Sequence, residues 1–125
     1  MSTILIVEDN AKNMKLVRDV LQHHGYTTLE AETGGAGLQL TLDRRPDLVL
    51  MDIQLPDIDG ASVLAKIREH SALDAMPVLA VSASVMPEEQ QRVVRSGFDG
   101  FIAKPISVKP FLAAVQRALA EGRAK

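Results

Sequence analysis

Five polar residues of this 125-residue sequence end or follow short apolar runs, and their side chains suit one kind of chemistry. They are the acid pair Glu8 and Asp9, then Asp52, Ser82 and Lys104. Carboxylates held close together repel one another unless a cation neutralises them, and oxygen ligands favour a hard divalent cation such as Mg²⁺. An aspartate oxygen can attack phosphorus, while an ammonium group and a hydroxyl can bind phosphoryl oxygens. Brought together, these residues predict a magnesium-dependent site that takes and holds a phosphoryl group.

The apolar runs before these residues predict strands. Several of the runs are too continuously apolar to have a solvent-facing side, which is typical of strands buried on both faces of a parallel sheet. The five predicted strands are Thr3–Val7, Thr27–Ala31, Leu48–Met51, Val78–Val81 and Gly100–Ala103.

Segments with helical spacing of apolar residues separate the predicted strands. They contain Met14, Val17 and Leu21; Leu38 to Leu42; Val63, Leu64 and Ile67; a polar stretch from Pro87 to Ser96; and Val108, Leu112, Val115 and Leu119. Alternating strands and helices predict an α/β fold, doubly wound, with a five-stranded parallel sheet and five helices. Ligands of such sheets bind beyond the carboxyl ends of the strands, where the five polar residues are expected to meet.

Composition excludes several classes of protein. The chain has no cysteine, which excludes disulfides, thiolate metal sites and cysteine nucleophiles. Its formal net charge is −2, so the total charge predicts no direct binding to nucleic acid or to an anionic membrane. The first apolar run is far shorter than a signal peptide's apolar region or the ~20 residues of a membrane span. We expect a cytoplasmic protein in which residues 1–125 form a single domain, with no output domain.

Four segments are similar to those of a known family. Ile4–Asn10, Leu48–Gly60, Val81–Ala83 and Lys104–Pro105 resemble, in order and position, the receiver domain of two-component response regulators. The resemblance covers essentially the whole chain and implies the flavodoxin-like receiver fold, with strand order 2-1-3-4-5. Within the family, the sequence looks most like the stand-alone DivK type, which acts in phosphorelays.

The resemblance implies a role for each acidic residue of the site. Asp52 would be the phosphoacceptor and a ligand of Mg²⁺. Asp9 would bind the metal directly, Glu8 would act on it through a water molecule, and Gln54 would offer its backbone carbonyl. Glu8 stands where many receivers have Asp, which lengthens one arm of the metal site.

The remaining implied roles concern the phosphoryl group and the response to it. Lys104 would pair with the phosphoryl group, and Ser82, in place of the commoner Thr, would form a hydrogen bond to it. Phe101 would be the switch aromatic, whose inward or outward position reports the phosphorylation state together with Ser82. Gln54 and Ser84 lie where family members vary their dephosphorylation rate, so the phosphoryl lifetime is left open.

The implied function is a switch that catalyses only its own phosphoryl transfer and dephosphorylation, and is not otherwise an enzyme. The donor would be a histidine kinase or a histidine phosphotransfer protein, docked on the first helix near Asn13. A downstream signalling protein would bind the face formed by the fourth helix, fifth strand and fifth helix. Four bases give the second half of the chain its positive excess: Arg92, Arg95, Lys109 and Arg117.

Alternative interpretations remain. The chain could be the receiver domain of a hybrid histidine kinase or of a larger regulator. An FMN-binding module of the same fold would need a glycine- and hydroxyl-rich phosphate loop after the first strand, where Glu8 and Asp9 have the wrong charge. Gly34–Gly37 is expected to be a loosely packed helix start rather than a phosphate loop, and Asp57–Asp59 a loop and helix start rather than a phosphatase motif.

Overall fold

The computed structural model describes residues 2–83 and 86–122, without the side chains at positions 89 and 94. Its strands form one parallel sheet in the order β2-β1-β3-β4-β5, which confirms the predicted fold. The apolar runs of β3 and β4 each gain one polar residue, because Asp52 and Ser82 continue the strands. The strands are β1 (Thr3–Val7), β2 (Thr27–Ala31), β3 (Leu48–Asp52), β4 (Val78–Ser82) and β5 (Gly100–Ala103).

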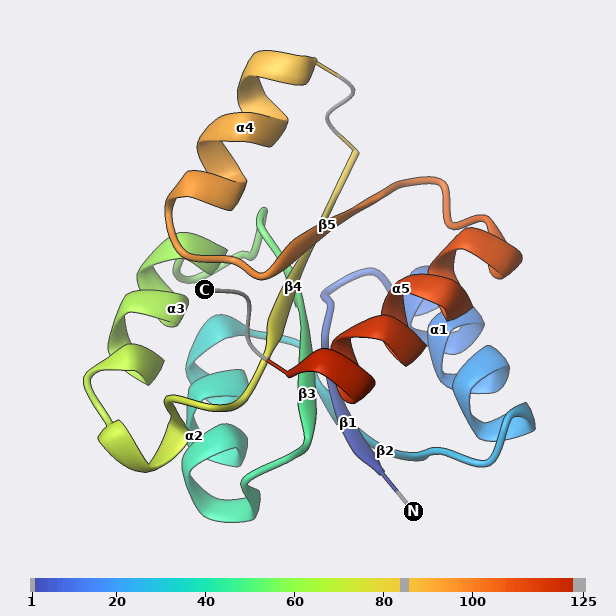
Figure 1. The fold of residues 1–125 in the computed structure, drawn as a ribbon, viewed down its shortest axis with the longest axis horizontal. Coiled ribbons are helices and arrows are strands. Elements are labelled where there is room, and N and C mark those ends of the chain that lie inside the picture. The colour runs from blue at the N-terminus through green and yellow to red at the C-terminus, as the bar shows by residue number, and fades with distance from the viewer. Residues whose placement is uncertain (1, 84–85, 123–125) are drawn as a thin grey trace.

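Helices follow each strand and cover both faces of the sheet. They are α1 (Ala11–His23), α2 (Gly34–Arg44), α3 (Gly60–Arg68), α4 (Pro87–Arg95) and α5 (Val108–Glu121), with a short 3₁₀ helix, η1 (Ser71–Leu73), before β4. Figure 1 shows α1 and α5 on one face and α2, α3 and α4 on the other. Among the described residues, no helix combines the length and the apolar character needed to cross a membrane.

Four of the strands, β1, β3, β4 and β5, divide their side chains between two apolar clusters. In β1, Ile4 and Ile6 pack with residues of α1 and α5, while Leu5 and Val7 pack with residues of α3 on the opposite face. Every residue of β3 and β4 is buried. Burial on both faces explains why these runs are continuously apolar, and it leaves only the carboxyl ends of the strands for polar chemistry.

Helix α5 buries a face that only partly matches the predicted one, because Leu112 and Val115 are buried as expected but Val108 is not. Phe111, Val115 and Ala118 are buried together with Leu112, whereas Val108 is 43% exposed and Leu119 only partly buried. Apolar residues spaced three and four apart fit two overlapping faces of this helix. The fully enclosed Phe111 ring is the larger apolar group, and its burial sets the face that meets the sheet.

The glycines of α2 are closely packed, so the predicted loose packing was wrong. A Cβ atom on Gly37 would lie 2.8 Å from Cγ2 of Val7, and one on Gly34 would lie 2.9 Å from Cγ2 of Val63. Such distances are shorter than any ordinary carbon contact, so these glycines let α2 approach β1 and α3 closely. The buried Thr41 hydroxyl donates to the Gly37 carbonyl at 2.8 Å, which satisfies it within the helix.

Candidate functional site

Three carboxylates meet at the carboxyl ends of β1 and β3. The two strands are neighbours in the sheet, with Val7 paired in register with Met51, so the residues that follow, Glu8 and Asp52, also lie side by side. Each of Glu8, Asp9 and Asp52 offers one oxygen, and these oxygens lie within 4.8 Å of one another. Glu8 and Asp52 are buried, whereas Asp9 is exposed. The cluster therefore opens to solvent on the side of Asp9.

Lys104 provides the positive charge of this cluster. It follows β5, at the edge of the sheet, and its side chain reaches past β4 to the two buried acids. Its Nζ lies 2.9 Å from Oε1 of Glu8 and 3.0 Å from Oδ2 of Asp52. With all groups ionised, three carboxylates face one ammonium group, which leaves an excess of negative charge.

Burial and neighbouring charges change the acidity of two of these groups. Burial raises the pKa of the Glu8 carboxyl, and the neighbouring Asp52 raises it further, although the hydrogen bond from Lys104 opposes both effects. Burial alone would lower the pKa of Lys104, but its hydrogen bonds to Glu8 and Asp52 outweigh that effect and raise it. The lysine therefore stays charged while Glu8 is held in an environment that disfavours its ionised form.

A backbone amide orients each buried acid. The second oxygen of Glu8, Oε2, accepts a hydrogen bond from the Asn10 N–H at 3.1 Å. The second oxygen of Asp52, Oδ1, accepts one from the Gln54 N–H at 2.9 Å. Each acid thus uses one oxygen for Lys104 and the other for the amide two residues later, so both carboxylates are fixed in place.

The donor set fits a divalent cation. Mg²⁺ takes one or two carboxylates and keeps several waters, so these oxygens suffice even while Lys104 shares two of the acids. A second positive group would also reduce the negative excess of the cluster. Asp9 and Asp52 would supply carboxylate oxygens, and Gln54, in the loop directly after β3, would supply its carbonyl. Glu8 contacts Lys104 directly, an ion pair that the sequence interpretation did not anticipate.

Comparisons with known proteins agree with this geometry. The chain matches the family described as response regulator receiver domain over residues 4–116. It belongs to that family. It is 40% identical over 119 residues to the polar-differentiation response regulator DivK of Brucella anthropi, with 95% of this chain and 97% of the relative covered.

Solved structures of other receivers have the same fold. A CheY-like response regulator receiver domain protein from Methanospirillum hungatei superposes with a TM-score of 0.86 at 29% identity, covering 97% of this chain and 95% of the other. The receiver domain of the sensor histidine kinase PA1611 from Pseudomonas aeruginosa has a TM-score of 0.88 at 27% identity, covering 95% and 98%. That domain was crystallised with a magnesium ion coordinated in its active site cleft.

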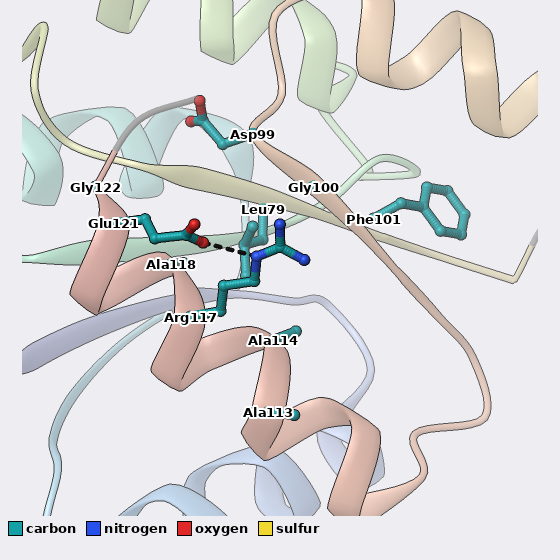
Figure 2. Close-up of a pocket in the computed structure, with 10 residues that line it drawn as sticks. All are labelled: Leu79, Asp99, Gly100, Phe101, Ala113, Ala114, Arg117, Ala118, Glu121 and Gly122. Atoms are coloured by element: carbon teal, nitrogen blue, oxygen red, sulfur yellow. Dashed lines mark hydrogen bonds and ion pairs between the residues drawn. The ribbon is translucent and has the colours of Figure 1, made fainter. Parts of the chain in front are cut away.

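The remaining predicted site residues that the structure describes lie on β4 and β5. Ser82 is buried at the end of β4, one position after Val81, the register partner of Asp52. Its carbonyl accepts the Lys104 N–H at 2.8 Å, which ties the ends of β4 and β5 together. Phe101 is half-buried, and its ring projects away from α5 (Figure 2) toward the cluster under α3 and α4. Ser84, the second predicted rate-tuning position, lies outside the described residues.

A groove runs between β5 and α5 of the receiver (Figure 2). Leu79 and Gly100 line it on the sheet side, and small α5 side chains, among them Ala114, line the other wall. Arg117 and Glu121 form an ion pair of 2.6 Å along the groove. No sequence pattern predicts this groove, since it arises from small residues on two elements that meet only in the fold.

Proposed function

We propose that this receiver accepts a phosphoryl group on Asp52 from a phosphohistidine donor, in a Mg²⁺-dependent reaction, and then presents a changed surface to a partner protein. One observation carries the proposal. Asp52 is a buried carboxylate held between an ammonium group and a backbone amide, next to two further carboxylates that can bind a cation. The match to DivK over nearly its whole length supports a role in phosphorelay signalling.

The proposed reaction is a simple displacement at phosphorus. An oxygen of Asp52 forms a bond to phosphorus as the bond from phosphorus to the donor's imidazole nitrogen breaks. The nitrogen keeps the electron pair and takes up a proton, and the product is an aspartyl-phosphate, a mixed anhydride. Bound Mg²⁺ would neutralise charge on the phosphoryl oxygens. Lys104, already 3.0 Å from Asp52, would add a second positive contact, and Ser82 would donate its hydroxyl.

The protein would catalyse only the gain and loss of its own phosphoryl group, in the cytoplasm. A histidine kinase or histidine phosphotransfer protein would dock on α1, which begins beside the acidic cluster. Leu16 on this helix is 40% exposed, and Asn13 lies one turn closer to Asp9. Both residues lie near the acceptor, where a docked donor protein would contact them.

Output would come from the face formed by α4, β5 and α5. Ser82 would move toward the phosphoryl group, and Phe101 would turn inward into the space that it leaves. Four exposed bases, together with the groove between β5 and α5, give that face a character suited to an acidic downstream signalling protein: Arg92, Arg95, Lys109 and Arg117.

Labelling with acetyl phosphate tests the acceptor assignment. We expect purified protein to take up acid-labile, hydroxylamine-sensitive phosphate only when Mg²⁺ is present, and Asp52→Asn to take up none. Asp43→Asn, which alters an exposed acid on α2, is the matched control and should label like the unchanged protein. Normal labelling of Asp52→Asn would overturn the proposed function.

Beryllofluoride, which mimics a phosphoryl group, tests the switch. We expect it to shift the backbone resonances of Ser96–Lys104 and α4 far more than those of α2. Ser82→Ala should still bind beryllofluoride, yet show smaller shifts at Phe101. Uniform shifts throughout the chain, or an unaltered pattern in Ser82→Ala, would exclude a switch that works through Ser82 and Phe101.

A further inference from the structure

The loop from Ile53 to Asp59, between β3 and α3, is fastened to the start of α2 by one side chain. Asp57 accepts the Gly34 N–H through Oδ1 at 2.8 Å and the Gly35 N–H through Oδ2 at 2.9 Å. These backbone hydrogen bonds, from Gly35 and then Gly34, lower the pKa of the Asp57 carboxyl. Both oxygens of this exposed side chain thus accept hydrogen bonds from a segment more than 20 residues away in sequence.

The contact is more than a helix cap, because α2 already has one. Thr33 is the N-cap, and its hydroxyl accepts the Ala36 N–H at 3.1 Å. Asp57 takes the two preceding N–H groups, which the helix itself leaves without partners. The positive end of the helix dipole adds to the attraction for a carboxylate. Asp57 therefore binds strongly to α2 although α2 does not need it for its own N-cap.

The same loop carries the groups that orient the phosphoacceptor. At its base, the Ile53 N–H donates to the Val81 carbonyl at 3.1 Å, and the Ile53 carbonyl accepts the Gly60 N–H at 3.0 Å. The next residue, Gln54, donates its N–H to Oδ1 of Asp52 at 2.9 Å. The direction of the Gln54 peptide therefore depends on the path the loop takes toward α3.

The segment that Asp57 contacts also supports the other buried acid of the site. The Ala31 carbonyl, at the end of β2, accepts the Glu8 N–H at 2.9 Å. The short stretch from Ala31 to Gly35 thus forms hydrogen bonds to the backbone of Glu8 and to the loop that contains Asp57. The same loop orients Asp52 through the Gln54 amide. The stretch acts as a common support for the two sides of the acidic cluster.

We propose that Asp57 is a positioning residue for the phosphoryl site. By holding the middle of the loop against the start of α2, Asp57 keeps the Gln54 N–H hydrogen-bonded to Asp52. It also keeps the Gln54 carbonyl directed toward the position proposed for the cation. This inference rests on the proposed function for the part that concerns phosphorylation. Its structural part, the dependence of the Gln54 amide on Asp57, can be measured without metal or phosphate.

The test compares Asp57→Ala with Asp57→Asn and with Thr33→Val. Thr33→Val removes the hydroxyl cap from the same helix end but leaves the loop fastened, so it controls for any general weakening of α2. In metal-free protein, we expect hydrogen exchange of the Gln54 amide to be about tenfold faster in Asp57→Ala and unchanged in Thr33→Val. Asp57→Asn keeps one acceptor oxygen and should fall between the two.

Two further measurements extend the test to the reaction. Supporting residues around metal sites typically change affinity or activity by 10–100-fold, so we expect Mg²⁺ binding and acetyl phosphate labelling of Asp57→Ala to weaken by about tenfold. Urea unfolding of all variants, measured in parallel, shows whether Asp57→Ala and Thr33→Val lose comparable global stability. If Asp57 had only a structural role, hydrogen exchange of the Gln54 amide would follow global stability in both Asp57→Ala and Thr33→Val.

The outcomes separate the two proposals. Gln54 exchange and Mg²⁺ binding that stay within twofold of the unchanged protein in Asp57→Ala would overturn the positioning role, as would an equal change in Thr33→Val. Unchanged protein that takes up no phosphate would overturn the proposed function. In that case the exchange comparison would still decide whether Asp57 positions Gln54.

Discussion

The two ends of the sheet each bury an ion pair, but only one of them is balanced. At the amino ends of β4 and β5, Arg68 lies 3.2 Å from Asp99, and both side chains are largely buried. The same Asp99 oxygen accepts the Val78 N–H at 2.8 Å, and the guanidinium group donates to the Leu73 carbonyl at 2.9 Å. In this pair of described residues, one cation faces one anion, and each has additional backbone partners.

At the carboxyl ends, Lys104 pairs with two carboxylates of a cluster of three, and the charges do not cancel. A buried pair that is broken on one side costs several kcal/mol, so the balanced pair acts as a fixed structural joint. The unbalanced cluster would instead lower its energy by taking up a cation from solution, as the proposed function requires. Under the proposed function, the fold would thus keep its rigid ion pair and its reactive cluster at opposite ends of one sheet.

The largest effect is expected where the balanced pair is broken. Asp99→Ala leaves the Arg68 guanidinium buried without its anion and should lower the free energy of unfolding by about 3 kcal/mol. Glu121→Gln, which breaks the exposed pair with Arg117, is the control and should cost less than about 0.5 kcal/mol. Urea denaturation measures both. A cost below about 1 kcal/mol for Asp99→Ala would contradict the role of a structural joint.

A smaller loss is expected at the unbalanced end. Lys104→Met removes the ammonium group from two buried acids, which can partly relieve their repulsion by taking up a proton, so we expect a loss of about 2 kcal/mol. Added Mg²⁺ should recover part of that loss, because a cation replaces the missing charge. Lys15→Met, at an exposed pair with Asp19, is the control. Thermal unfolding with and without Mg²⁺ would show the difference, and an equal response to Mg²⁺ in both variants would contradict it.

Removing an acid from the cluster should raise the free energy of unfolding rather than lower it. Asp9→Asn relieves repulsion within the acidic cluster and should stabilise the metal-free protein by about 1 kcal/mol, the size of a close charge pair near water. It should also remove most of the stabilisation that Mg²⁺ gives to the unchanged protein. Destabilisation of the metal-free Asp9→Asn protein would show that the cluster is not strained by like charges.

Much of this arrangement follows from the sequence, because parallel strands bring their ends together. Acids at the carboxyl ends of β1 and β3 must be neighbours once the strand order is known, and the positions of Glu8 and Asp52 relative to the apolar runs place them there. The pairing of Lys104 with Glu8 was not anticipated, because a flexible side chain reaches across β4 to form it. The longer arm of glutamate, compared with aspartate, was the available signal.

Other features had no local signature at all. The partners of Asp57 are the N–H groups of Gly34 and Gly35, which every residue except proline carries, so no residue type marks them. The Arg68–Asp99 pair joins residues that are 31 positions apart in the sequence. These two side chains meet only because α3 packs against the sheet. Contacts of this kind depend on the assembled fold rather than on spacing along the chain.

The smallest expected effect is a change of stability with pH that comes from the raised pKa of the Glu8 carboxyl. Because the folded state raises the Glu8 pKa above its ordinary value of 4.5, the folded protein binds this proton more tightly than the unfolded chain. Stability should therefore fall as pH rises from the ordinary value through the folded pKa. Glu8→Gln lacks this contribution, so its stability should change less between about pH 4.5 and 7 in metal-free urea titrations. An unchanged slope would contradict the burial effect.

The late position of β5 in the chain makes completion of the acidic cluster depend on the last strand of the sheet. Lys104 is 52 residues from Asp52 in sequence, and it reaches the acid only after β5 has paired with β4 at the edge of the sheet. A chain still emerging from the ribosome, or one whose last strand has opened, contains the acceptor but lacks its ammonium group. Under the proposed function, such a copy would accept phosphate poorly, so phosphorylation would be coupled to pairing of the last strand.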